Sequence, residues 1–257
     1  MKISVVTIVY NDVKHIQKTI ESVLSQTALS DMEYVVVDGK STDGTSDIIK
    51  SYQSKIDNYI CETDSGIYNA MNKGLKCVTG DYVIFMNSGD AFSSSSVVAD
   101  VLGAARALPE LPAMIYGDYR ECSGTSYSDN IPSRHYSKIW YGAVASHQST
   151  FYNVAFLRRN NLVYDESYKI AADYKLSMEV ITLAKGDVLQ LSGLCVCDFD
   201  ITGVSCCNQN RGLEEANRAR REVLHYSQIR IAGISLLQLS ARYLKRFAKP
   251  LYKLMRH

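Results

Sequence analysis

Short apolar runs, separated by polar turns, mark the first part of the chain. The run "ISVVTIVY" (residues 3–10) is β-branched and nearly continuous, which is typical of a strand buried on both faces of a parallel sheet. The runs "EYVVV" (33–37) and "YVIF" (82–85) have the same character, and a shorter strand fits within residues 58–64. The pattern therefore predicts a series of mostly buried strands.

Helical spacing of apolar residues fills the intervals between these strands. Apolar positions recur every three or four residues in 15–24, 48–52 and 67–78, which predicts amphipathic helices. Later in the chain the pattern loosens into short strands and polar loops, and helical spacing returns at 171–184 and 213–228. Strands that alternate with helices form a mostly parallel sheet, so the predicted fold class is α/β with helices flanking the sheet.

Three carboxylates follow predicted strands, namely Asp38, Asp64 and Asp90. Ligands of open parallel sheets bind beyond the carboxyl ends of the strands, so we expect these side chains along one edge of the sheet. Carboxylates there suit Mg²⁺ or Mn²⁺, which favour oxygen ligands. A simpler interpretation stays open, because "NSGD" (87–90) is turn-forming at every position.

Charge and cysteine content narrow the class of protein. Residues 211–257 hold eleven Lys or Arg against three acids, a net +8, which leaves −7 on residues 1–210 of a chain whose total is +1. A basic excess confined to one tail, with few aromatics among its basic residues, argues against nucleic-acid binding. Seven cysteines without a CxxC pair or a His cluster predict reduced thiols, and neither a signal peptide nor a membrane span is predicted. We therefore expect a cytoplasmic protein.

Five segments occur in an order that carries a family resemblance. They are "ISVVTIVYN", "VVVDGKSTDGT", "DSGIYNAMNKG", "GDYVIFMNSGD" and "AADYKL", and the match around them covers roughly residues 3–205. In this order they resemble glycosyltransferase family 2 with the GT-A fold. The "DSGIYNAMNKG" form is similar to bacterial enzymes that assemble O-antigen, capsule or exopolysaccharide units. The resemblance implies an inverting, metal-dependent hexosyltransferase with a nucleotide-sugar donor, a UDP-sugar being favoured and a GDP-sugar possible.

The resemblance implies a nucleoside-binding role for four residues. Asp38 matches the position that accepts hydrogen bonds from the nucleobase or ribose, and Asp64 matches a second base-contacting acid. Thr7 and Tyr10 stand where the end of the first strand lines the nucleotide pocket. Simpler interpretations are an Asp that shapes the turn before Gly39 and two ordinary strand residues.

The diphosphate and the metal are assigned in the same way. Asn72 lies in a run similar to the family's Ala-Arg-Asn-x-Gly, where Arg and Asn approach the diphosphate, but Met71 replaces that Arg. "FMNSGD" aligns with the Asp-x-Asp-Asp metal signature, with Asn87 at the first acid, Gly89 at the second and Asp90 at the third. The resemblance therefore implies Asp90 as the ligand of Mn²⁺ or Mg²⁺, with Asn87 in support.

Catalysis and acceptor binding fall on residues of the second half. Asp173 in "AADYKL" resembles the family's catalytic base, although an acid that caps the predicted helix has the same residue type. A base there deprotonates the acceptor hydroxyl during an in-line displacement that inverts the anomeric configuration. His147 and Gln148 stand where related sequences carry a pair beside the acceptor, and "ITGVS" (201–205) resembles a loop near the donor.

The basic tail predicts membrane contact. On a helical wheel, residues 234–257 place apolar side chains on one face and basic side chains on another, although Pro250 breaks the pattern. Such a helix lies on anionic lipid at the inner face of the cell membrane, where a polyprenyl-diphosphate-linked saccharide acceptor is held. The alternative is a helix that packs on the catalytic domain with its basic side in solvent.

The expected organisation is a catalytic domain at 1–210 and a helical tail at 211–257. Within the domain, about 1–105 forms the nucleotide-sugar half and about 106–210 the acceptor half. Two other functions stay open, a nucleotidyltransferase of related fold and a non-catalytic glycan- or nucleotide-binding relative. Against the first, "VYNDVKH" lacks the glycines of a phosphate-binding loop.

Overall fold

The structure of the chain is a computed structural model that describes residues 1–202 and 209–247. Of the segment 201–205, which resembles a family loop near the donor, the structure describes only residues 201 and 202. Of the predicted membrane-binding tail, residues 248–257 lie outside the described part.

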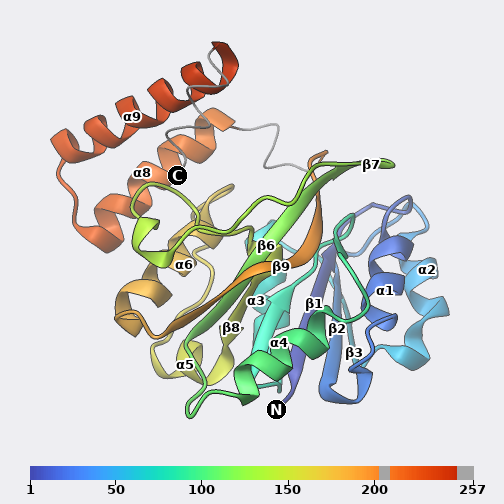
Figure 1. The fold of residues 1–257 in the computed structure, drawn as a ribbon. Coiled ribbons are helices and arrows are strands. Elements are labelled where there is room, and N and C mark those ends of the chain that lie inside the picture. The colour runs from blue at the N-terminus through green and yellow to red at the C-terminus, as the bar shows by residue number, and fades with distance from the viewer. Residues whose placement is uncertain (203–208, 248–257) are drawn as a thin grey trace.

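Four parallel strands form the first half of one sheet (Figure 1). The central strand β1 (Ile3–Val9) pairs in parallel with β2 (Met32–Asp38) on one side and β4 (Tyr82–Phe85) on the other. Strand β3 (Asn58–Cys61) adds to β2 at the edge. Every residue of β1, β2 and β4 is buried, which explains the continuous apolar runs that predicted these strands.

The second half of the sheet mixes directions. Strand β8 (Thr150–Asn153) lies antiparallel between β4 and β6 (Met114–Ser123), while β9 (Val188–Asp200) runs parallel to β6. The short strands β5 (Ala91–Phe92) and β7 (Ser126–Tyr127) pair antiparallel with β9 and β6. Six of the nine strands in the described residues therefore share one direction, and the order is β3-β2-β1-β4-β8-β6-β9-β5.

Helices cover both faces of the sheet. Those of the described residues are α1 (Ile16–Leu24), α2 (Thr45–Ser51), α3 (Ile67–Cys77), α4 (Val97–Arg106), α5 (Val154–Arg159), α6 (Ala172–Ala184), α8 (Gln209–Leu224) and α9 (Gln228–Phe247), with 3-10 turns at Leu29–Asp31, Gln53–Lys55, Tyr136–Lys138 and His147–Ser149. One core packs α1 and α4 on the sheet, and the other packs α3 and α6 on the opposite face. The predicted α/β sheet flanked by helices is confirmed.

The C-terminal helices pack at the end of the molecule that carries α6 (Figure 1). Arg220 of α8 is fully buried, and its guanidinium donates to the carbonyl oxygens of Trp140 and Tyr141, each at 2.8 Å. A third hydrogen bond joins it to Asn217 at 2.6 Å. Helix α8 thus contacts the expected acceptor half directly, and the domain boundary at residue 210 stays a prediction.

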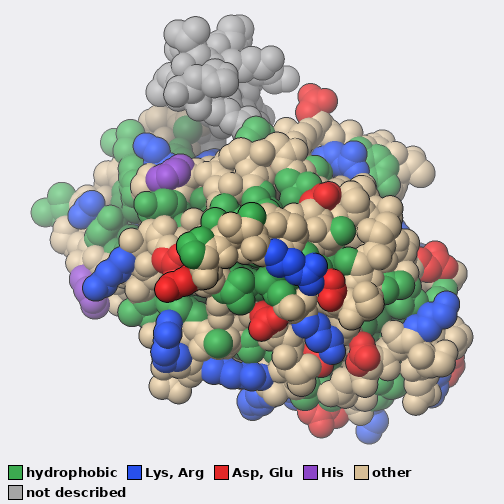
Figure 2. Space-filling model, turned by 60° about the horizontal axis from the view of Figure 1, so that its bottom comes forward, with side chains coloured by type: hydrophobic (Ala, Val, Ile, Leu, Met, Phe, Trp, Pro, Cys, Tyr) green, Lys and Arg blue, Asp and Glu red, His purple; other side chains and the backbone are tan. Residues whose placement is uncertain are grey.

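Charges are interspersed on the face that Figure 2 shows, where Lys and Arg side chains alternate with Asp and Glu. Such mixing leaves no extended basic surface on that face of the kind that tracks a nucleic-acid backbone. Helix α9 is the longest helix of the described residues, and no helix there has the length and hydropathy that crossing a bilayer requires.

Candidate active site

A cavity of about 1060 Å³ lies beyond the carboxyl ends of β1 and β4. Loops of the first half form one wall, and the segments around 143–148 and 169–173 form another. Seven of the predicted site residues line it: Tyr10, Asp64, Asn87, Asp90, His147, Gln148 and Asp173. Thr7, Asp38 and Asn72 are not among the described residues that line this cavity.

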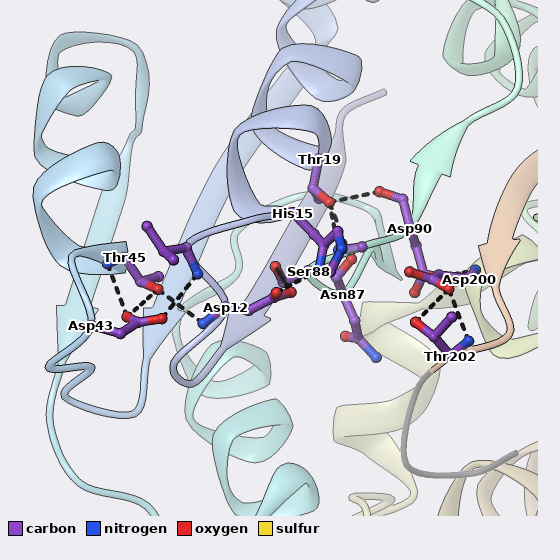
Figure 3. A network of polar contacts seen from close by, with 12 residues as sticks. Asp12, His15, Thr19, Asp43, Thr45, Asn87, Ser88, Asp90, Asp200 and Thr202 are labelled. Atoms are coloured by element: carbon purple, nitrogen blue, oxygen red, sulfur yellow. Dashed lines mark hydrogen bonds and ion pairs between the residues drawn. The ribbon is translucent and has the colours of Figure 1, made fainter. Parts of the chain in front are cut away.

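The turn after β4 is built to present Asp90. Gly89 takes a left-handed backbone (φ +98°), and Thr19 of α1 holds the turn from outside. The Thr19 hydroxyl accepts from the Gly89 N–H at 3.0 Å and donates to the Asp90 carbonyl oxygen at 2.7 Å (Figure 3). The Asp90 carboxylate accepts from the Asp200 N–H at 2.8 Å and from the Gln148 amide at 2.7 Å. Both halves of the chain thus meet on this carboxylate.

Burial makes the Asp90 carboxylate easy to protonate. The residue is 3% exposed, and this desolvation raises the pKa of Asp90 from 3.8 to about 6. Hydrogen bonds from Asp200 and Gln148 and the nearby His147 oppose the rise, while the negative charge of Asp200 adds to it. A cation beside Asp90 offsets the same cost and keeps the carboxylate ionised.

The side-chain atoms around Asp90 include several oxygens, the ligand type that Mn²⁺ and Mg²⁺ favour. The side-chain oxygen of Asn87 is buried and has no hydrogen-bond partner in the described residues, and it belongs to the same turn as Asp90. The Asp200 carboxylate lies beside this turn, with one oxygen 3.1 Å from where a Cβ on Gly89 would stand (Figure 3). Within residues 1–202 and 209–247 no group of three or more His, Cys, Asp or Glu is arranged as a metal site. A divalent ion there therefore needs phosphate or water oxygens to complete its coordination.

His147 lies between Asn87, in the same turn as Asp90, and Asp173. Its Nε2 lies 3.0 Å from the Asn87 amide nitrogen, and its Nδ1 lies 3.5 Å from the Asp173 carboxylate. A proton on Nδ1 leaves Nε2 free to accept from Asn87, which accounts for the unpartnered Asn87 oxygen. Asp173 is the second residue of α6, and its other contact is the Tyr68 hydroxyl at 3.4 Å. The Asp173 carboxylate is thus open to the cavity.

Tyr10, Gly39 and Asp64 lie together beyond β1 and β2. The Tyr10 ring is 64% exposed although the strand before it is buried. A Cβ on Gly39 would lie 2.5 Å from the Asp64 carboxylate and 3.0 Å from the Tyr10 ring, so any larger residue there would displace the Asp64 side chain. The exposed ring and the adjacent acid form a wall suited to a flat, hydrogen-bonding group such as a nucleobase.

Asp38 and Thr7 serve the surrounding frame. Asp38 is fully buried, and its carboxylate accepts from the Ser41 N–H at 2.9 Å, from the Ser46 hydroxyl and from the Tyr59 hydroxyl at 3.1 Å. Burial alone would raise the pKa of Asp38, but these hydrogen bonds hold it below the usual value. The Thr7 hydroxyl lies 3.0 Å from the Tyr34 hydroxyl inside the core. Donor contact by either residue stays a prediction.

The side chain of Asn72 is hydrogen-bonded to residues in the second half of the chain. Its amide nitrogen donates to the Tyr164 carbonyl oxygen at 2.8 Å and to Glu166 at 2.9 Å, and its oxygen accepts from the Tyr164 N–H at 2.9 Å. The residue is 6% exposed. In this arrangement it fastens α3 to the loop before α6, and its predicted contact with the diphosphate is not tested.

Two acidic groups at the site were missed by the sequence patterns. Asp12 accepts from the Ser88 hydroxyl at 2.7 Å and lies 2.6 Å from His15 Nδ1, which ties the β1–α1 loop to the turn that carries Asp90. An Asp just before a predicted helix is a common cap, so the sequence carries no signal for this second role. Asp200 is the last residue of β9, a strand that the sequence patterns did not predict.

The model of the family described as glycosyl transferase family 2 matches residues 4–175. The chain belongs to this family. An uncharacterised glycosyltransferase of Mycobacterium tuberculosis is 29% identical over 204 residues, which cover 79% of this chain and 76% of that protein. The putative teichuronic acid biosynthesis glycosyltransferase TuaG of Bacillus subtilis is 39% identical over 99 residues, or 37% of this chain and 38% of TuaG.

Solved structures of glycosyltransferases share the fold. TarS of S. aureus, solved in complex with UDP, aligns with a TM-score of 0.69 at 21% identity, over 97% of this chain and 73% of TarS. The mannosyltransferase PcManGT of Pyrobaculum calidifontis, solved with GDP-Man and Mn²⁺, aligns with a TM-score of 0.66 at 15% identity, over 88% of this chain and 65% of that one. The predicted GT-A type of α/β fold and the predicted family are thereby confirmed.

Proposed function

We propose that this family 2 glycosyltransferase is an inverting enzyme that moves one hexose from a nucleotide-diphosphate sugar to a lipid-linked saccharide. The observation that carries the proposal is the convergence of Tyr10, Asp64, Asp90 and Asp173 on one cavity. These residues supply a nucleotide wall, a metal-side carboxylate and a base within a single space. The fold is shared with TarS bound to UDP and with PcManGT bound to GDP-Man, so UDP-sugars are the first donors to test and GDP-sugars the second.

The transfer step follows from the place of Asp173. An acceptor hydroxyl attacks the anomeric carbon of the donor from the face opposite the diphosphate, and the bond from that carbon to the diphosphate oxygen breaks. The hydroxyl proton passes to the Asp173 carboxylate, and the nucleoside diphosphate departs with the bonding electron pair. One displacement inverts the configuration, so an α-linked donor gives a β-linked product. His147 Nδ1 lies 3.5 Å from the Asp173 carboxylate, which accepts this proton.

Asp90, Asp200 and the side-chain oxygen of Asn87 are the residues that would hold Mn²⁺ or Mg²⁺. When bound, the ion supplies positive charge against the charge that develops on the leaving diphosphate. The chain itself contributes the buried turn that fixes these oxygens and the Gln148 amide that orients Asp90 at 2.7 Å. Activity that persists undiminished in chelator would overturn the metal assignment.

An acceptor that carries phosphate suits the second wall of the cavity. Arg134, Lys169 and Arg211 all line it. Arg211 is paired with Glu215 at 3.1 Å, whereas no described carboxylate lies within ion-pair distance of Arg134 or Lys169. Cations without an acidic partner favour an anionic ligand, and the diphosphate of a polyprenyl-linked saccharide provides one. Such acceptors belong to the assembly of O-antigen, capsule or exopolysaccharide.

Helix α9 supports peripheral attachment to the inner face of the cell membrane. Its inward side buries Ile231 and Ile234, while Leu236, Leu237 and Leu239 are 66%, 56% and 54% exposed. Exposed leucines on a tail of net charge +8 suit an anionic bilayer. Replacing Leu236 and Leu239 by Glu in the full chain should abolish co-sedimentation with phosphatidylglycerol vesicles. Binding equal to that of wild type would refute the attachment.

The function is tested by offering purified protein a panel of UDP-, GDP- and dTDP-sugars with Mn²⁺, then repeating the active reactions in chelator.

Asp173→Asn should lower kcat by about 10²- to 10⁴-fold and leave nucleotide affinity within about twofold. Asp90→Ala should abolish transfer, and Asn87→Ala should only weaken it. If Asp173→Asn leaves function untouched, the chain is a binding protein. If sugar phosphate and nucleoside triphosphate react instead, it is a nucleotidyltransferase.

A further inference from the structure

The start of helix α6 has no cap of its own. Ala171 stands at the N-cap, and its methyl side chain cannot accept a hydrogen bond from the first turn. The backbone N–H groups of Lys169, Ile170 and Ala171 also need acceptors, because Ile170 is partly buried and Ala171 is buried. The partner comes from another helix, more than forty positions later in the chain.

Glu215 of α8 accepts all of these hydrogen bonds with one carboxylate. The N–H of Lys169 reaches it at 3.0 and 3.1 Å, that of Ile170 at 2.8 Å and that of Ala171 at 3.0 Å. Arg211 adds a charged hydrogen bond at 3.1 Å, and Glu215 is 9% exposed. Burial alone would raise the pKa of Glu215, but these donors hold it below its usual value, so the carboxylate is ionised at neutral pH.

The carboxylate of Asp173 has no comparably short contact. Its neighbours are the Tyr68 hydroxyl at 3.4 Å and His147 at 3.5 Å, both longer than the 2.7–3.2 Å of a good hydrogen bond. Asp173 follows Ala171 by two residues, so the place of its side chain depends on where the backbone of the first turn is held. Among the described residues, Glu215 is the one side chain that accepts hydrogen bonds from the N–H groups of residues 169, 170 and 171.

Helix α8 is itself anchored firmly enough to act as a reference. The Arg220 guanidinium binds the 140–141 turn with two hydrogen bonds of 2.8 Å. Two residues to either side of Arg220, Glu222 accepts from the Tyr168 hydroxyl at 2.8 Å, and Arg218 stacks on the Tyr168 ring at 4.2 Å. The helix therefore grips the segment before α6 at two separate points.

We propose that Glu215 is a positioning residue for the transfer step, holding residues 169–171 so that the Asp173 carboxylate meets the acceptor hydroxyl. This proposal rests on the proposed function of Asp173. It makes α8 part of the catalytic unit, because the base is placed by a side chain of the expected tail. Glu215 touches neither donor nor acceptor in this role, so its loss should alter turnover and leave donor binding intact.

The test compares Glu215→Gln with Glu222→Gln, a matched change on the same helix. Glu222→Gln breaks the ion pair with Arg218, but its amide oxygen can still accept from the Tyr168 hydroxyl, and the hydrogen bonds from residues 169–171 to Glu215 stay in place. Glu215→Gln should lower kcat by about 10- to 100-fold, since small displacements of a reacting group cost about that much. Its donor KM and UDP affinity should stay within about twofold of wild type. Glu215→Asp keeps the charge on a shorter side chain, so its kcat should lie between those of wild type and Glu215→Gln.

A second readout does not depend on activity. Hydrogen exchange at the amides of Lys169, Ile170 and Ala171 should be faster in Glu215→Gln and unchanged in Glu222→Gln. Wild-type kcat in Glu215→Gln, or unchanged exchange at these amides, would overturn the proposal. If the Gln variant does not fold, the Asp variant decides, because wild-type kcat there also overturns it. Absence of transfer by the wild type with every donor refutes the proposed function instead, and leaves the exchange result to report on the Glu215 contact.

Discussion

Replacing Asp90 by Asn should stabilise the metal-free protein at neutral pH while it removes transfer. Asp90 is 3% exposed, and burial raises its pKa from 3.8 to about 6. The folded state therefore holds this proton more tightly than the unfolded chain does. Consequently wild type loses stability as the pH rises from about 4 to about 6, and the loss is complete above that window.

The size of the effect follows from the shift. About two pKa units correspond to about 3 kcal/mol of destabilisation above pH 7, and to about half of that at pH 5. Asparagine has the same shape and no charge, and its side-chain oxygen can still accept from the Asp200 N–H. The Gln148 amide has only to turn over, since a side-chain NH₂ then faces it in place of a carboxylate oxygen.

Urea unfolding in EDTA at pH 5, 6, 7 and 8 measures the difference directly. The free energy of unfolding of Asp90→Asn minus that of wild type should grow by about 1 to 2 kcal/mol between pH 5 and pH 7 and then level off. Asp47→Asn is the control, because the Asp47 side chain is 82% exposed and should show no such trend. A difference for Asp90→Asn that is constant from pH 5 to pH 8 would refute the cost of this buried carboxylate.

Two further substitutions test the frame of the site. Gly39→Ala should weaken UDP binding by about tenfold or more, because its Cβ would lie 2.5 Å from the Asp64 carboxylate; calorimetry should find Gly103→Ala, which meets nothing within 4 Å, unchanged. Arg220→Met should lower the free energy of unfolding by about 2 to 4 kcal/mol, since buried carbonyl oxygens lose charged donors. Denaturation of the exposed Arg221→Met variant should differ from wild type by about 0.5 kcal/mol at most, and equal losses in both would contradict this account.

Strands that are buried on both faces could be predicted from the sequence. In β1 (Ile3–Val9) and β2 (Met32–Asp38) every residue is buried, so the apolar run alone marks the element. Strand β9 (Val188–Asp200) was missed because it is only partly buried over most of its length and contains Gly193 in a left-handed conformation. Its register with β6 also shifts near Gly117, which hides the alternation that a strand pattern needs.

The site residues likewise divide into those that the sequence could predict and those that it could not. Asp90 and Asp173 could be picked from strand ends and motif order, and the structure brings both to one cavity. The partners that fix them lie far away in the chain: the Asp200 N–H binds Asp90 across 110 positions. Asn72 binds Tyr164 across 92 positions. No local pattern encodes such pairings, because they depend on how β8 and β9 insert between elements made much earlier.

The order in which the chain is synthesised gives the Glu215 contact a temporal meaning. Every strand of the described sheet precedes α8, so the sheet and the nucleotide wall can form while Glu215 is still unmade. Until then the N–H groups of residues 169–171 have no carboxylate to bind, and the backbone beneath Asp173 is unfastened. A nascent chain at that stage is expected to bind a nucleotide sugar without transferring the sugar, and competence for transfer arrives only once α8 has been made.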